Sequence, residues 1–282
     1  MIIEKEWLVK RIANKDISIV DCRFDLQNKE LGKQQYDKDH LPNAVYFHLE
    51  EDLSGEVKVH GGRHPLPDLE LFKQKLEAAG ISNDSTVVVY DSGEGVFAGT
   101  FAARFLWMMK YVGHENVMIL NGGYSKWKEA GYPLVDTTPV LAKGIYTIHV
   151  QEEMLATYER VKDFTITRPK DTILIDSREY NRYAGIEESI DRIAGHIPGA
   201  VNEPFMEGLE NGLFLAKEGQ QLRFKHLGRD KVLIVYCGSG VTASPNYIAL
   251  KEAGFDDVKM YVGSYSDWVS YEDNPVEKVE KH

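Results

Sequence analysis

A cysteine is followed by glycines and small residues in the stretch Cys237-Gly238-Ser239-Gly240-Val241-Thr242. A thiol acts as a nucleophile in its thiolate form, and its ordinary pKa is about 8.5. Two glycines that flank a serine allow the backbone to curl, so that successive N–H groups point at one spot, as in an anion-binding nest. We therefore predict a loop that surrounds the Cys237 sulfur and stabilises its anion.

The residues on either side of this loop indicate where it lies. Before it, residues 232–236 are five uncharged β-forming residues, a pattern typical of a buried strand in a parallel sheet. After it, residues 243–253 show helical spacing and are followed by Gly254, which favours the end of a helix. A loop between a strand end and a helix start is where open α/β sheets bind ligands. The alternative is a buried, unreactive cysteine, because free cysteines are among the most buried residues.

The residues from Cys237 to Thr242 resemble the active-site loop of the two-domain rhodanese-type sulfurtransferases, in the form found in 3-mercaptopyruvate sulfurtransferases. Thiosulfate-preferring members typically carry Arg and Lys where this chain has Gly238 and Ser239. The resemblance implies an enzyme that moves sulfane sulfur from 3-mercaptopyruvate, a small anionic donor, through a Cys237 persulfide. The implied acceptor is a thiol such as thioredoxin, or cyanide. Thiosulfate as the donor, or a non-enzymatic persulfide carrier, are the alternatives.

The sequence repeats itself over most of its length. Strands alternate with helices in both halves, which predicts an α/β fold with a parallel sheet flanked by helices in each copy. The resemblance makes this a tandem duplication of a rhodanese-like domain. The corresponding segments are Val20-Asp21-Cys22-Arg23 with Ile175-Asp176-Ser177-Arg178, His40-Leu41-Pro42 with His196-Ile197-Pro198, Val88-Val89-Tyr90-Asp91 with Ile234-Val235-Tyr236-Cys237, and Gly122-Gly123-Tyr124-Ser125-Lys126-Trp127 with, after a small shift, Val262-Gly263-Ser264-Tyr265-Ser266-Asp267-Trp268.

The repeat predicts the domains and identifies the active copy. We expect one domain over residues 1–137, a linker over 138–143, and a second domain over 144–282. At the strand end where the second copy has Cys237, the first has Asp91. A carboxylate cannot carry sulfur, so catalysis is predicted in the second domain.

Both candidate donors are anions, so the site needs cations. Arg182 matches an arginine that binds the substrate carboxylate in the family, and the guanidinium fork suits a carboxylate. A second family arginine falls where this chain has Ser189, and Arg192 is the nearest replacement. The alternative for each arginine is a surface ion pair, with Glu187 or Asp191 as the partner.

The resemblance also implies the remaining site residues. The main chain from Gly238 and Gly240 to Val241 and Thr242 is expected to bind the donor and the persulfide.

Candidate acids and bases come from the first half of the chain. His64 matches a family histidine, and Glu50 falls near the acidic residue that pairs with it. Together with Ser239 these residues would form a relay for proton transfer. Asp52 is the alternative to Glu50. The histidines of the His-Leu-Pro and His-Ile-Pro motifs, His40 and His196, are interpreted as structural.

Length, charge and cysteine content narrow the functional classes. The 282 residues suffice for two domains, and a formal net charge of -11 disfavours nucleic acid or an anionic membrane as a partner. The amino terminus lacks the apolar core of a signal peptide, and no apolar run is long enough to span a membrane. With only two cysteines, Cys22 and Cys237, we expect no disulfide framework and a cytoplasmic location.

Other chemistries lack their signatures. There is no Cys and His cluster at zinc spacing and no phosphate-binding glycine fingerprint, so we expect neither a metal nor an organic cofactor. A cysteine phosphatase loop would carry an arginine six residues after the cysteine, where this chain has Ala243. A phosphate dianion would therefore find too few donors.

Overall fold

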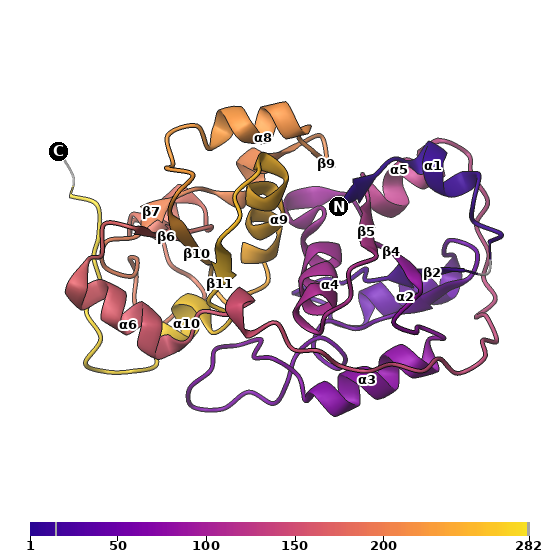
Figure 1. The fold of residues 1–282 in the computed structure, drawn as a ribbon, viewed down its shortest axis with the longest axis horizontal. Coiled ribbons are helices and arrows are strands. Elements are labelled where there is room, and N and C mark those ends of the chain that lie inside the picture. The colour runs from indigo at the N-terminus through magenta and orange to yellow at the C-terminus, as the bar shows by residue number, and fades with distance from the viewer. Residues whose placement is uncertain (15, 281–282) are drawn as a thin grey trace. The chain divides into compact units, whose positions relative to one another are not determined.

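The computed structural model describes residues 1–14 and 16–280. The chain forms two compact units, and neither is continuous in the sequence (Figure 1). Unit 1 comprises Met1–Gly55, Leu66–Gln151 and Asn211–Phe214. Unit 2 comprises Glu56–Pro65, Glu152–Glu210 and Leu215–His282. The predicted linker at residues 138–143 and the residues up to 151 lie in unit 1, whereas residues 56–65 pack with the second half of the chain.

Unit 1 contains a five-stranded parallel sheet with the strand order β1-β5-β4-β2-β3. Its strands are β1 (Ile2–Ile3), β2 (Ile17–Asp21), β3 (Ala44–Tyr46), β4 (Thr86–Tyr90) and β5 (Val117–Leu120), and unit 1 also includes β9 (Leu213–Phe214). Its helices are α1 (Lys5–Val9), α2 (Leu31–Lys38), α3 (Leu69–Ala78), the short 3-10 helix η1 (Gly95–Phe97), α4 (Thr100–Tyr111) and α5 (Gly123–Glu129).

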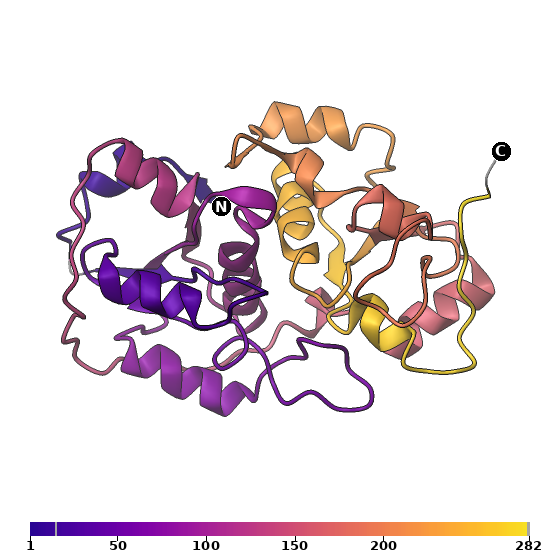
Figure 2. The same ribbon diagram turned by 180° about the vertical axis from the view of Figure 1, so that it is seen from behind.

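Helices cover both faces of this sheet. Side chains alternate along β4, so that Val88 and Tyr90 face the cluster that includes Tyr36 of α2 and Trp127 of α5. Figure 2 shows α2 in front of this sheet. The opposite face is covered by α4, in which every residue except Lys110 is buried. The continuous apolar character of β4 follows from this burial on two sides.

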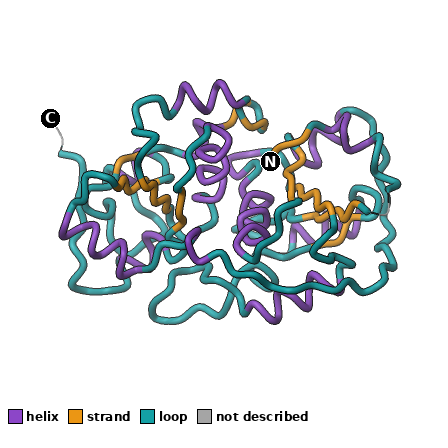
Figure 3. Tube along the Cα trace, in the orientation of Figure 1, coloured by secondary structure: helices purple, strands orange, loops and turns teal. Residues whose placement is uncertain are grey.

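Unit 2 contains a four-stranded parallel sheet with the strand order β11-β10-β6-β7. Figure 3 colours the strands orange and the helices purple. Its strands are β6 (Thr172–Asp176), β7 (Val201–Asn202), β10 (Val232–Tyr236) and β11 (Val258–Met260), and unit 2 also includes β8 (Leu209–Glu210). Its helices are η2 (Glu152–Met154), α6 (Tyr158–Thr167), α7 (Tyr180–Tyr183), η3 (Phe205–Gly208), α8 (Lys217–Arg223), α9 (Ala243–Ala253) and α10 (Ser264–Trp268).

The core of unit 2 follows the same plan. Ile234 and Tyr236 of β10 face a cluster that contains Phe164 of α6 and Trp268 of α10. Helix α9 packs against β10 and β11, and α8 packs against α9. The fold predicted from the repeat, two parallel sheets flanked by helices, is thereby confirmed, and β10 and α9 have the predicted bounds.

The two histidines of the repeated motifs occupy equivalent places. His40 stacks on Tyr36 at 4.0 Å between ring centroids, and His196 stacks on Tyr183 at 3.9 Å. In each copy the histidine Nδ1 also lies 2.7 or 2.8 Å from the carbonyl oxygen of the same tyrosine. Both rings are buried, so the motifs fix a turn against the sheet.

No helix within residues 1–14 and 16–280 combines the length and the apolar composition that crossing a bilayer requires.

Candidate active site

Cys237 lies at the carboxyl end of β10, which runs between β6 and β11 in the parallel sheet of unit 2. The chain then turns, and α9 begins at Ala243. The Cys237 side chain is 1% exposed, so the sulfur is shielded from bulk water. Polar contacts to the sulfur are stronger in such a place than in water.

A main-chain N–H of the loop points at the sulfur. The N–H of Gly240 donates to Cys237 Sγ over 3.2 Å, and Ser264 Oγ lies 4.0 Å from the same sulfur. Gly240 has a φ of +78°, and a β-carbon there would lie 2.3 Å from the carbonyl oxygen of Val262. Only glycine fits this position, because any side chain would collide with backbone and strain the left-handed conformation.

The rest of the loop leads into the helix. Val241 is buried, and its carbonyl oxygen accepts a hydrogen bond from the N–H of Ser244 over 3.1 Å. Thr242 is the N-cap residue of α9. The positive end of the α9 dipole therefore lies at the end of the loop that begins with Cys237.

Ser239 and His64 form a hydrogen-bonded pair within unit 2. Ser239 Oγ and His64 Nδ1 are 2.8 Å apart, and both side chains are buried. A hydroxyl in contact with an imidazole can pass a proton to or from a bound molecule. The structure thus brings together two residues that are 175 positions apart and that the sequence predicts as partners.

His64 reaches this place because residues 56–65 are fixed to α10. The N–H of Gly61 donates to Asp267 Oδ1 over 2.7 Å, and the N–H of Arg63 donates to Ser266 Oγ over 3.2 Å. Further contacts are made by His60, which stacks on Tyr271 at 3.9 Å, and by Gly62, where a β-carbon would lie 2.3 Å from the carbonyl oxygen of Gly263.

Two guanidinium groups lie beside Gly238. A β-carbon at this position would lie 3.0 Å from Arg63 Nη2 and 3.5 Å from Arg182 Nη1. Arg182 comes from α7, and Arg63 comes from the segment that carries His64. The loop that holds Cys237 therefore faces two positive charges.

Buried carboxylates hold both guanidinium groups. Arg182 donates to Glu188 through Nε and Nη2, over 3.1 and 2.9 Å, and through Nη2 to Asp191 over 2.7 Å. Asp191 also pairs with Arg63 Nη1. The Glu188 and Asp191 side chains are 2% and 1% exposed.

The pKa of Glu188 reflects opposing causes. Burial acts to raise it, but N–H groups of Asp191 and Ile190 and the charge of Arg182 lower it, and the net shift is downward. Glu188 is therefore ionised over the neutral range.

Arg192 lies near this group but is directed elsewhere. Its Nη2 donates to the carbonyl oxygen of Val269 over 2.7 Å. Arg63, Asp191 and Arg192 together line a cavity of about 280 Å³ in unit 2. The second guanidinium beside Gly238 thus belongs to Arg63, a residue that the sequence analysis did not select.

The two candidate acidic residues lie in unit 1. The Glu50 carboxylate pairs with Lys29 at 2.7 Å. Asp52 pairs with Lys75 at 3.0 Å and accepts the N–H of His48 over 2.7 Å. The pairing of Glu50, or alternatively Asp52, with His64 stays a prediction.

In the corresponding loop of unit 1, the side chain of Asp91 accepts the main-chain N–H groups. The Asp91 carboxylate is buried and accepts main-chain N–H groups over 3.0 to 3.2 Å from Gly93, Gly99, Phe101 and Ala102. Burial raises the pKa of Asp91, and these four hydrogen bonds act against that shift. In both copies main-chain N–H of this loop donates to the side chain of its first residue, but only unit 2 places a sulfur there.

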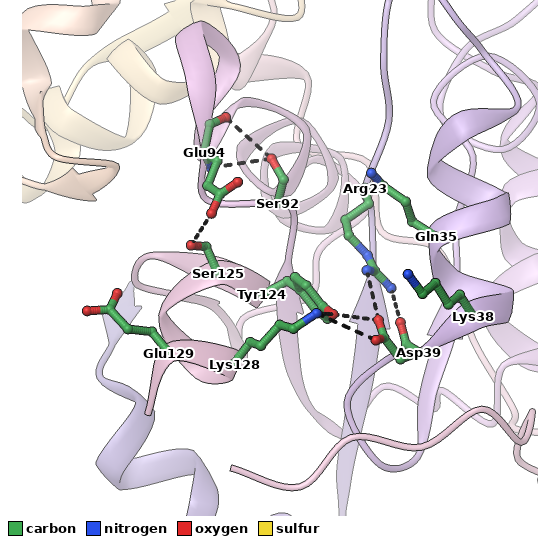
Figure 4. A pocket seen from close by; sticks show the side chains of 10 residues that line it. All are labelled: Arg23, Gln35, Lys38, Asp39, Ser92, Glu94, Tyr124, Ser125, Lys128 and Glu129. Atoms are coloured by element: carbon green, nitrogen blue, oxygen red, sulfur yellow. Dashed lines mark hydrogen bonds and ion pairs between the residues drawn. The ribbon is translucent and has the colours of Figure 1, made fainter. Parts of the chain in front are cut away.

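A cavity of about 590 Å³ in unit 1 does not offer the thiol chemistry of the Cys237 loop (Figure 4). Arg23, Tyr124 and Lys128 gather around Asp39, and Glu94 contacts Ser125. Among the described residues that line this cavity there is no cysteine. We therefore assign the candidate active site to unit 2.

Within the described part of the chain, no three Cys, His, Asp or Glu side chains lie close enough together to hold a metal ion.

Arg63, Glu188 and Ser264 are the site residues that sequence reasoning missed. Arg63 is adjacent to His64, and Ser264 belongs to a repeated motif, but neither position by itself predicts a role in the site. Only the folded chain shows that all three surround the Cys237 loop.

The chain is similar to known proteins over almost its whole length. Residues 4–130 and 159–271 each match the model of the rhodanese-like domain. The chain is 37% identical over 281 residues to a probable 3-mercaptopyruvate sulfurtransferase of Pseudomonas aeruginosa, covering 98% of this chain and 97% of the relative. It is 30% identical to the thiosulfate sulfurtransferase of Rattus norvegicus, covering 95% and 91%. SseA from Escherichia coli superposes with a TM-score of 0.81 at 30% identity, covering 94% and 98%.

Proposed function

The chain belongs to the rhodanese-like family, and from that premise we propose that it is a sulfurtransferase that takes sulfane sulfur from 3-mercaptopyruvate. The observation that carries the proposal is the Cys237 sulfur held by the Gly240 N–H next to the Ser239–His64 pair. The nearest positive charges, on Arg63 and Arg182, suit a donor that carries a carboxylate.

The first step forms a persulfide. The Cys237 thiolate attacks the thiol sulfur of 3-mercaptopyruvate, an S–S bond forms, and the C–S bond breaks with its electron pair going to carbon. The carbon product leaves as the enolate of pyruvate and takes up a proton, which we assign to delivery through Ser239 and His64. The sum is a cysteine thiol plus mercaptopyruvate giving a cysteine persulfide plus pyruvate.

The second step returns the enzyme to its thiol form. One thiol of the acceptor attacks the outer sulfur of the persulfide, and a second thiol resolves the product to a disulfide with release of hydrogen sulfide. A dithiol such as reduced thioredoxin supplies both thiols, and cyanide in an assay takes the same sulfur to give thiocyanate. The Gly240 N–H would stabilise the persulfide anion between the two steps.

We also propose that the protein works in the cytoplasm. Cys22 and Cys237 are both free thiols, and the reaction requires reduced Cys237 and a thiol acceptor. The proposed partners are therefore a small anionic donor and a reduced thiol protein.

A side-by-side assay of 3-mercaptopyruvate and thiosulfate as donors, with cyanide and with thioredoxin as acceptors, tests the proposal. We expect kcat/KM for 3-mercaptopyruvate to exceed that for thiosulfate by at least about tenfold, because neither Gly238 nor Ser239 provides a cation for a dianion. A preference for thiosulfate would favour the alternative donor. A persulfide that forms only when a partner protein loads Cys237 would favour a carrier.

A further inference from the structure

The sequence provides one of the two arginines that the family uses to bind the donor carboxylate. Arg182 matches the expected arginine, but Ser189 stands at the position of the second one. The nearest arginine in the sequence, Arg192, donates to the Val269 carbonyl oxygen instead. The structure supplies a different guanidinium beside Gly238, that of Arg63.

We propose that Arg63 and Arg182 bind the donor carboxylate together, with one N–H group from each. This inference rests on the proposed function, and it assigns the second carboxylate-binding residue of that site to Arg63. Its evidence is the direction of the two guanidinium groups and the carboxylates that hold them.

Each guanidinium uses one side for structure and leaves another toward the loop. Arg182 donates through Nε to Glu188 and through Nη2 to Asp191, and Arg63 pairs through Nη1 with Asp191. The remaining atoms, Arg182 Nη1 and Arg63 Nη2, have no hydrogen-bond partner among the residues that the structure describes. They lie 3.0 Å (Arg63) and 3.5 Å (Arg182) from a β-carbon at position 238, and the bonded Arg182 Nη2 lies 3.6 Å from it.

Asp191 positions both arginines. Its side chain is 1% exposed and contacts a guanidinium with each oxygen, Oδ1 to Arg63 and Oδ2 to Arg182. A carboxylate shared in this way fixes the spacing and the orientation of the two groups before a donor arrives, which reduces the entropic cost of binding. We therefore class Asp191 as a positioning residue, and Arg63 and Arg182 as binding residues.

The charges of the group favour a singly charged donor. Three arginines, Arg63, Arg178 and Arg182, are held by three carboxylates, Asp176, Glu188 and Asp191. This group is neutral before the donor binds. Binding therefore depends on the two N–H groups that point at the loop, which can pair with the two oxygens of one carboxylate, whereas a dianion would bring a second charge for which the group holds no further cation.

Steady-state kinetics with 3-mercaptopyruvate test the assignment. We expect Arg63→Ala to raise KM about tenfold and to leave kcat within about threefold, as for the loss of a charged contact made in the bound ground state. Arg63→Lys keeps the charge without the fork and should recover only part of the loss. Lys58→Ala is the matched control, because Lys58 is an exposed cation lining the same cavity as Arg63, and it should match the wild type.

Asp191→Asn separates orientation from charge. The substitution removes a negative charge, so a purely electrostatic effect would lower KM for an anionic donor. If Asp191 positions the arginines, KM rises at least about threefold while kcat stays unchanged. A lower KM would overturn the positioning role of Asp191.

Binding of pyruvate to the Cys237→Ser variant gives a readout without turnover. Titration calorimetry should show weaker pyruvate binding when Arg63→Ala is added, and unchanged binding when Lys58→Ala is added. Inorganic tetrasulfide, which has no carboxylate, should load Cys237 equally in the wild type and in Arg63→Ala.

The outcomes distinguish this inference from the proposed function. If the wild type does not turn over 3-mercaptopyruvate, the proposed function fails, and pyruvate titration still tests the carboxylate site. If the wild type is active but folded Arg63→Ala matches it in KM and in pyruvate binding, Arg63 is not a binding residue. A rise in KM for Arg192→Ala in that case would assign the role to Arg192.

Discussion

The main-chain N–H of Gly240 lies 3.2 Å from the sulfur of Cys237 and donates to it. Gly240 can do so because it adopts a φ of +78° against the Val262 carbonyl oxygen, where no other residue fits. The equivalent loop of unit 1 gives its N–H groups to the Asp91 carboxylate. The two copies thus share a loop whose main-chain N–H groups contact the side chain of its first residue, and they differ in which side chain that is.

Cys237 and Cys22 are predicted to behave differently. Cys237→Ser should abolish both turnover and the mass gain of one sulfur atom after donor treatment, and Cys22→Ser should change neither. Burial, reinforced by the charges of Asp21 and Asp91, raises the pKa of the Cys22 thiol well above its ordinary value, so this thiol stays protonated and unreactive. Intact-protein mass spectrometry measures the gain, and peptide mapping that located the persulfide on Cys22 would refute the assignment.

His64 is predicted to act in proton transfer. His64→Asn should lower kcat for 3-mercaptopyruvate at least about tenfold, because the enolate of pyruvate then loses its proton donor. Loading of Cys237 by inorganic tetrasulfide creates no enolate and should be unaffected. Circular dichroism checks that the variant is folded, and equal losses with both sulfur sources would point to a structural role for His64.

The residues after the cysteine are predicted to set the donor preference. Replacing Gly238 by Arg and Ser239 by Lys adds two cations beside the sulfur and removes the hydroxyl that contacts His64. Attraction of the second charge should then favour thiosulfate, so the ratio of kcat/KM for thiosulfate to that for 3-mercaptopyruvate rises. Ser239→Ala alone is the control for the lost hydroxyl. An active double variant with an unchanged ratio would contradict the prediction.

Glu188 is predicted to make stability depend on pH in the acid range. The pKa of Glu188 is lower in the folded state than its ordinary value, so its contribution is present above the unfolded pKa of about 4.3 and disappears as pH falls through the folded value. Glu188→Gln should cost about 2 kcal/mol at pH 7 through weakened charged hydrogen bonds. Denaturant unfolding at several pH values should show this difference shrinking below about pH 4. A difference that is constant with pH would rule out the ionised form as its origin.

Local sequence determined the parallel sheets and the place of Cys237. Residues 232–236 form β10 as predicted, because an uncharged run of β-forming residues has no stable place except inside a sheet covered on both faces. The helix ends at Gly254, which adopts a φ of +94°. The substitution of Asp91 for cysteine identified the copy without a sulfur. These features depend on neighbouring residues, so a linear pattern suffices.

Only the tertiary structure decided which cations lie beside the loop that follows Cys237. Arg63 precedes Cys237 by 174 positions, and it arrives beside Gly238 because residues 56–65 bond to α10 rather than to the half of the chain in which they occur. Arg192 is closer to Cys237 in the sequence, but its guanidinium donates to the main-chain carbonyl oxygen of Val269. Such a choice depends on long-range hydrogen bonds and on the directions of flexible side chains, and neither leaves a periodic trace in the sequence.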